Sequence, residues 1–209
     1  MSIMRVVPLC LVLIPLLLLA APVDAEREWE VLERVGAGSS GHVLSRGSSQ
    51  VAGASRYRMV TTLEAPPAVV ARAAIVFLTD DRYTPAGQVR TILRSDEREI
   101  LTHLRIDVPL ASDRDVVTRI VFDEQGGTHR LDWREVDGAA PDPAQGVVRI
   151  PHLRGSFELR EGGLGVTAIT YDTEVDLGGR LPAAIVASFF PRQIKAQMDG
   201  LRRAVADSE

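Results

Sequence analysis

The chain of 209 residues has only one cysteine, Cys10, and only one lysine, Lys195. Cys10 lies in an N-terminal segment that we expect to be removed, so the folded part should have no disulfide, no thiolate zinc site and no cysteine nucleophile. A strongly basic face is also missing, because the net charge is −4 and the arginines are scattered. A nucleic-acid partner is therefore not expected, since phosphate neutralisation needs clustered cations.

The N-terminus has the order of features that is typical of a secretory signal peptide. Arg5 precedes an apolar run, residues 6–21, and small residues flank position 24 before a predicted cleavage site after Ala25. The run is shorter than the roughly 20 residues that a transmembrane helix needs. We therefore expect residues 1–25 to be cleaved and residues 26–209 to form one domain in a secreted, periplasm-like compartment. An uncleaved membrane anchor is the alternative. Lipidation at Cys10 is rejected because the preceding Leu9 is bulky.

Residue periodicity predicts an α+β order in the rest of the chain. A short helix is expected at 26–35, a buried helix at 68–78 and a long terminal helix at 182–206, kinked at Pro191. Two strands should precede the buried helix, at 42–47 and 57–65. Six should follow it, at 88–94, 99–107, 115–123, 129–136, 147–159 and 165–177. Because the gaps between these six are too short for crossover helices, we expect an antiparallel meander.

Several joints of this pattern resemble START-like domains of the helix-grip (SRPBCC, Bet v 1-like) superfamily. The most specific match is residues 108–117, VPLASDRDVV, and weaker matches follow in order at 148–149, 155–159, 170–171 and 176–182. The similarity covers roughly residues 28–206. It departs from the common pattern at Leu110–Ala111 and at Phe157. The resemblance implies a curved antiparallel sheet wrapped around the C-terminal helix, with an internal hydrophobic cavity.

Alternation along the strands then gives the residues expected to line that cavity. They are Leu104, Ile106, Thr118, Ile120, Trp133, Phe157, Ile169, Tyr171, Thr173, Ile185 and Phe189. Small or polar inner residues, namely Thr118, Thr167, Thr173, Ala183 and Ala187, favour a space that side chains do not fill. A filled core is the alternative for any one of these positions.

The remaining motifs favour structural roles. Residues 36–41 spell G-x-G-x-x-G, but no strand is expected before them and no helix after, so a dinucleotide site is not predicted. Residues 172–178 place carboxylates at alternate positions without the later ligands of a calcium loop. The four histidines lack metal-ligand spacing. We interpret Asp113, Arg114 and Asp115 as a salt-bridged corner in which the arginine keeps both carboxylates ionised. No cofactor and no metal are expected.

We therefore predict non-covalent binding of a lipid or other hydrophobic small molecule, with transient membrane contact if the ligand is transferred. Thr118, Tyr171 and Thr173 could orient a polar head, and access would need movement of the terminal helix or of the loop at 137–143, with Pro191 or Gly178–Gly179 as hinges. One alternative is a cyclase- or aromatase-like enzyme using Tyr171, His103 or Arg119. Alternation places His103 and Arg119 on the outer face, which weakens this reading. A protein-binding module of the cell envelope is the other alternative.

Overall fold

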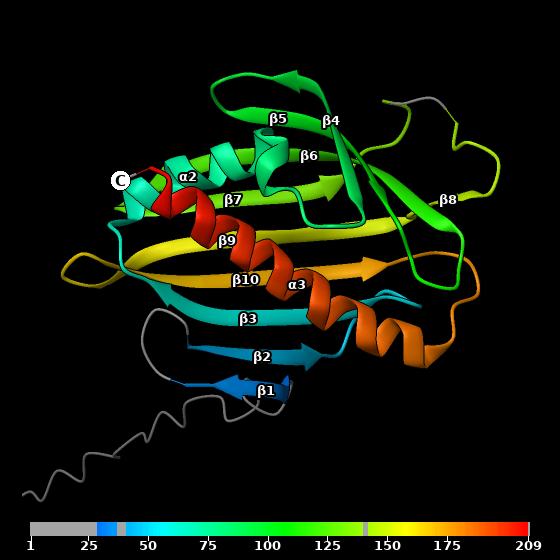
Figure 1. The fold of residues 1–209 in the computed structure, drawn as a ribbon, viewed down its shortest axis with the longest axis horizontal. Helices are drawn as coiled ribbons and strands as arrows, with labels where there is room; N and C mark the ends of the chain where they lie inside the picture. The colour runs from blue at the N-terminus through cyan, green and yellow to red at the C-terminus, as the bar shows by residue number, and fades with distance from the viewer. Residues whose placement is uncertain (1–28, 37–40, 140–141, 209) are drawn as a thin grey trace, which may run out of the picture.

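A single large antiparallel sheet forms one layer of the computed structural model, and two helices cover one of its faces (Figure 1). The structure describes residues 29–36, 41–139 and 142–208. The predicted signal segment, residues 37–40 of the glycine-rich turn and residues 140–141 of the 137–143 loop lie outside these ranges. Among the described residues, no helix is both long enough and apolar enough to span a membrane.

The strands are β1 (Trp29–Val35), β2 (His42–Gly47), β3 (Ser55–Leu63), β4 (Gln88–Ser95), β5 (Glu99–Ile106), β6 (Asp113–Gln125), β7 (Thr128–Glu135), β8 (Val147–Arg149), β9 (His152–Gly163) and β10 (Val166–Asp176). Their order in the sheet is β1-β2-β3-β10-β9-β7-β6-β5-β4, and all these neighbours are antiparallel. The predicted meander is confirmed, and β10 closes it against β3. The fold is the expected α+β helix grip.

Two sequence expectations about the strands are wrong. Residues 29–35 form strand β1 and no helix, because their backbone pairs with β2 and the Trp29 ring stacks against the guanidinium groups of Arg56 and Arg58. This tertiary pairing overrides the three-residue spacing of apolar side chains. The single strand expected at 147–159 is divided at Pro151, which has no amide hydrogen to donate. Its first part, β8, pairs in parallel with β6.

The helices are α2 (Pro67–Thr79), the short 3₁₀ helix η1 (Asp81–Tyr83) and α3 (Ala183–Ala206). Helix α3 crosses the inner face of the sheet, and the C-terminal part of α3 contacts α2 (Figure 1). Gly200 permits this close approach, since an added Cβ would lie 2.7 Å from the Phe77 ring and 2.8 Å from the Tyr83 carbonyl. The chain remains helical through Pro191.

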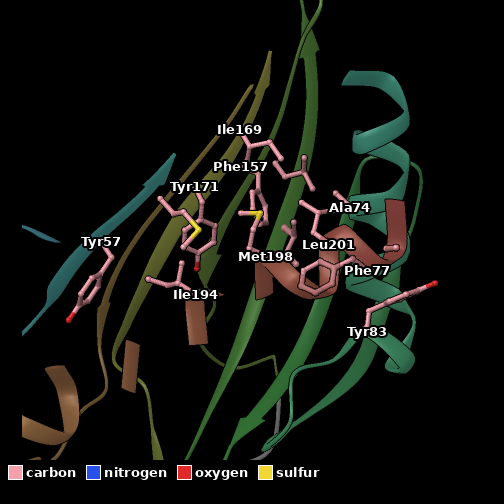
Figure 2. Packing of buried hydrophobic residues seen from close by; sticks show 14 of the residues in the cluster. Tyr57, Ala74, Phe77, Tyr83, Phe157, Ile169, Tyr171, Ile194, Met198 and Leu201 are labelled. Atoms are coloured by element: carbon pink, nitrogen blue, oxygen red, sulfur yellow. The ribbon is translucent and has the colours of Figure 1, made fainter. Parts of the chain in front are cut away.

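The core lies between the sheet and the two helices. Side chains of the central strands, including Phe157, Ile169 and Tyr171, point towards Met198 and Leu201 of α3 (Figure 2). All five are at most 4% exposed. Burial of such side chains contributes roughly 1.5–3 kcal/mol each, so this layer holds α3 on the sheet.

Candidate functional site

A cavity of about 120 Å³ remains inside the grip, between the inner face of the sheet and α3. That volume exceeds the roughly 30 Å³ occupied by one water molecule in the liquid, but it is smaller than the roughly 300–1,000 Å³ of sites for drug-sized ligands. Its walls come from β4 to β7, β9, β10 and α3, which are distant in sequence. The inner space is therefore neither solidly filled nor wide open.

Three aromatic rings form one wall of the cavity. Trp133, Phe157 and Tyr171 stand on the neighbouring strands β7, β9 and β10, with ring centroids 5.0–5.5 Å apart. Gly155 makes room for the indole, because an added Cβ would lie 2.5 Å from the Trp133 ring. Burial raises the pKa of the Tyr171 hydroxyl, which therefore stays protonated. This wall offers apolar contact together with the protonated hydroxyl of Tyr171.

Polar side chains gather where the cavity meets β4 and α3. Gln88 donates to Gln193 at 2.7 Å, and Gln197 lines the same part of the wall. Arg90 donates to the carbonyl of Phe77 at 2.8 Å, and burial lowers its pKa from the ordinary arginine value. Within the described ranges, no carboxylate lies at ion-pair distance from Arg90. A cation and three amides thus gather at one place in a mostly apolar wall.

Nine of the eleven predicted cavity residues line this cavity: Leu104, Ile106, Thr118, Ile120, Trp133, Phe157, Tyr171, Thr173 and Phe189. Ile169 is completely buried in the core outside it, and Ile185 is a half-buried residue in the first turn of α3. Contact of any of them with a ligand remains a prediction. Gln88, Arg90, Gln193 and Gln197 were not expected, because single polar residues on an edge strand or a helix carry no motif.

The expected small inner positions are only partly found. Thr118 and Thr173 line the cavity, whereas the hydroxyl of Thr167 donates to the carbonyl of Ala65 at 2.6 Å. Ala183 and Ala187 are exposed on α3 and add no space to the interior.

The interpretation of the Asp113–Arg114–Asp115 corner is wrong in its pairing. Consecutive strand residues point to opposite faces, so Arg114 cannot sit between its two neighbours. Its guanidinium is buried and donates to the carbonyls of Leu177 at 3.2 Å and Gly178 at 3.1 Å. It thereby fixes the segment that leads into α3.

The flanking carboxylates have other partners on the outer face. Asp113 accepts from Arg105 at 2.7 Å. Asp115 is nearly buried and accepts from Arg149 at 2.8 Å and from His103 at 2.9 Å. Burial by itself would raise the pKa of Asp115, but these hydrogen bonds outweigh it and lower that pKa.

The other titratable candidates also lie beside a carboxylate or a guanidinium. His42, His129 and His152 each face a glutamate within 3.5 Å, and Asp172 pairs with Arg58 at 2.9 Å. In the part of the chain that the structure describes, no group of three or more histidine or carboxylate side chains is arranged so that it could hold a metal ion. These pairs outside the cavity link neighbouring strands and stabilise the sheet.

The curved antiparallel sheet closed by a C-terminal helix defines the helix-grip fold of START-related domains. No family model matches the chain. An uncharacterised protein of Pseudomonas aeruginosa, PA1579, is 26% identical over 71% of this chain and 74% of its own length.

Three solved structures share this fold. A STAR-related lipid transfer protein of Xanthomonas axonopodis superposes with a TM-score of 0.69 at 19% identity, over 86% of this chain and 99% of that one. Human StAR-related lipid transfer protein 5 gives 0.67 at 19% identity, over 86% and 87%. The Zhui aromatase/cyclase of a Streptomyces species gives 0.55 at 12% identity, over 74% and 93%. At these identities the likeness establishes the fold alone.

Proposed function

We propose that the protein binds a lipid or similar amphiphile non-covalently, with its apolar part in the inner cavity and its polar head beside Arg90. The observation that supports this most is the partly open apolar space with polar groups gathered at one place in its wall. Removal of apolar ligand surface from water provides about 25 cal/mol per Å² before ordering costs. The lipid-transfer activity named for the Xanthomonas and human structures agrees with this assignment.

Arg90 favours a ligand that has an acidic head group. A partly buried guanidinium without a carboxylate partner retains donors for a carboxylate or phosphate, and such charge-assisted bonds are strong in a water-poor setting. Gln88, Gln193 and Gln197 can supply further hydrogen bonds to the head.

Binding a whole lipid requires the cavity to widen beyond 120 Å³. The first half of α3 is the element that moves in this proposal, since its first turn is largely exposed and it follows Gly178 and Gly179, both with positive φ (68° and 67°). Transient membrane contact would follow if the ligand is delivered. Export to the periplasm with cleavage after Ala25 is part of the same proposal and depends on the N-terminal sequence.

The first test extracts the purified protein with organic solvent and identifies copurified molecules by mass spectrometry. The expected result is an amphiphile at about one per chain. An aromatic ketone that is turned over, with activity lost in Tyr171→Phe, would favour the enzyme alternative, for which the protonated Tyr171 hydroxyl in the cavity is the supporting observation. A tight protein partner and no lipid would favour the envelope-module alternative.

A matched pair of variants tests the location. Thr118→Leu adds volume inside the cavity, whereas Thr170→Leu makes the same change on the outer face of β10. A fluorescent fatty acid should bind the first variant at least roughly tenfold more weakly, because the added atoms occupy ligand space. Binding to the second should stay unchanged. Equal binding by both variants would remove the cavity from the proposal.

A further inference from the structure

Three arginines stand side by side on the outer face of the sheet, opposite to the cavity. Arg119 of β6 pairs in register with Arg134 of β7, which pairs with Arg154 of β9. The row continues through Glu174 of β10 to Arg56 of β3. Like charges directly opposite each other on neighbouring strands destabilise a sheet. Negative charge close to the three arginines would therefore stabilise the sheet.

Glutamates of the chain supply negative charge to two of the three arginines, Arg119 and Arg154. The guanidinium of Arg119 donates to Glu99, and that of Arg154 donates to Glu174. Arg134, in the centre, is exposed. No hydrogen bond or ion pair joins its guanidinium to any other residue within 29–36, 41–139 and 142–208. The middle cation is thus left for solvent or for an external anion.

The arginines line a groove of about 550 Å³, which lies within the usual range of small-molecule sites. Ser48, Gln50 and Ser156 add hydroxyl and amide groups to its wall. The carboxylates in the wall are already engaged: Asp132 accepts from Arg130 at 2.8 Å and Asp172 from Arg58 at 2.9 Å. Their negative charge is balanced locally, so they do not compete for Arg134.

We propose that this outer groove binds a small soluble anion that carries a phosphate group, with Arg134 as its central contact. A guanidinium presents a planar fork of donors that matches phosphate oxygens in two parallel hydrogen bonds. Adjacent strands lie about 4.8 Å apart, so Arg119 and Arg154 can direct their remaining N–H groups to the same ligand. A phosphate has enough oxygens and negative charge to accept from all three arginines, whereas a carboxylate has two oxygens and one charge.

Titration calorimetry of the protein with inorganic phosphate, at ionic strength held constant with sodium chloride, tests the site. Wild type should bind one phosphate per chain, and Arg134→Gln should weaken binding at least roughly tenfold through loss of a bidentate charge-assisted contact. Arg34→Gln is the matched control, because Arg34 is an exposed strand arginine outside the groove, and it should bind as wild type.

Thermal unfolding separates lost binding from lost folding. Without phosphate, Arg134→Gln should melt at or above the wild-type temperature, since the change relieves repulsion in the row. Phosphate should raise the melting temperature of wild type and of Arg34→Gln, but not of Arg134→Gln. Arg134→Lys keeps the charge without the fork and should show an intermediate shift.

Three results would overturn the proposal. One is an equal phosphate effect on wild type and Arg134→Gln. Another is an equal effect of sodium acetate at the same ionic strength, which would indicate screening alone. The third is Arg134-dependent binding to vesicles of anionic phospholipid without binding of inorganic phosphate, which would assign the face to a membrane surface. None of these depends on whether the inner cavity binds a lipid.

Discussion

The two faces of the central strands differ sharply although they share one backbone. The inner face carries Phe157, Tyr171 and Ile120 against the helices, while the outer face carries arginines and carboxylates in ion pairs. Neighbours in sequence therefore have unlike surroundings, as Ile120 in the cavity wall and Arg119 in the outer groove demonstrate. Packing on the inner face should therefore set most of the protein's stability. Charge on the outer face should set how that stability depends on pH and salt.

The largest effect should come from the inner face. Phe157→Ala removes a ring that is 2% exposed and contacts Trp133 and Tyr171, so we expect a loss of about 3–5 kcal/mol in the free energy of unfolding. Glu158→Ala, one position along on the outer face, should cost under about 1 kcal/mol. Urea unfolding measures both. Similar losses in the two variants would contradict the division between the faces.

Arg114 is an exception to that division, because it is a charged residue inside. Arg114→Ala leaves the carbonyls of Leu177 and Gly178 without their donor, and we expect a loss of about 2–4 kcal/mol. Arg105→Ala on the outer face breaks an exposed pair with Asp113 and should cost under about 1 kcal/mol. Hydrogen exchange should also show faster opening of the first turns of α3 in Arg114→Ala. Unchanged exchange there would mean that Arg114 does not hold this junction.

The pH dependence should arise from the outer face. Hydrogen bonds from Arg149 and His103 outweigh burial and lower the pKa of Asp115, and a hydrogen bond from Arg119 lowers the pKa of Glu99. A carboxyl whose pKa is lowered on folding stabilises the native state fully above its unfolded pKa of about 4, and this stabilisation disappears as pH falls through the folded pKa. The melting temperature should therefore decrease as the pH is lowered below about 4.

Asp115→Asn isolates this contribution. The variant should be less stable than wild type at pH 7, by about 1–3 kcal/mol, because the neutral amide cannot replace both charge-assisted bonds. The difference should shrink as pH falls below about 4, where the wild-type carboxyl takes up a proton. A constant difference from pH 7 to pH 2 would show that Asp115 acts through shape and not through charge.

Much of the fold could be predicted because alternation and helical spacing are local properties of the sequence. The spacing of Phe190, Ile194, Met198 and Leu201 predicts the buried side of α3 correctly. Strand β1 could not be predicted in this way, since its pairing with β2 and the stacking of Trp29 on two arginines depend on distant segments.

The site shows the same limit. Inner-facing residues such as Thr118 follow from alternation, whereas the meeting of Gln88 with Gln193 depends on how α3 crosses β4. The outer arginine row depends on register, because Arg119, Arg134 and Arg154 are 15 and 20 positions apart and nothing in their local sequence aligns them.

The smallest effect on stability should come from Leu110, which belongs to neither face. Its side chain is 98% exposed in the turn between β5 and β6, and its φ of 61° lies in the left-handed region that favours glycine. Leu110→Gly should therefore change the free energy of unfolding by less than about 1 kcal/mol, with relief of strain offset by the greater chain entropy of the unfolded state.

The same variant also tests membrane contact. If the protein delivers lipid, an exposed leucine at a turn is suited to contact a bilayer. Leu110→Gly should then slow the transfer of a fluorescent fatty acid between vesicles without changing the affinity of the protein for that fatty acid. A comparable substitution at the other fully exposed leucine, Leu164→Gly in the turn between β9 and β10, serves as the control. Slower transfer in both variants would point to a general loss of apolar surface, whereas slower transfer in Leu110→Gly alone would place membrane contact at the turn between β5 and β6.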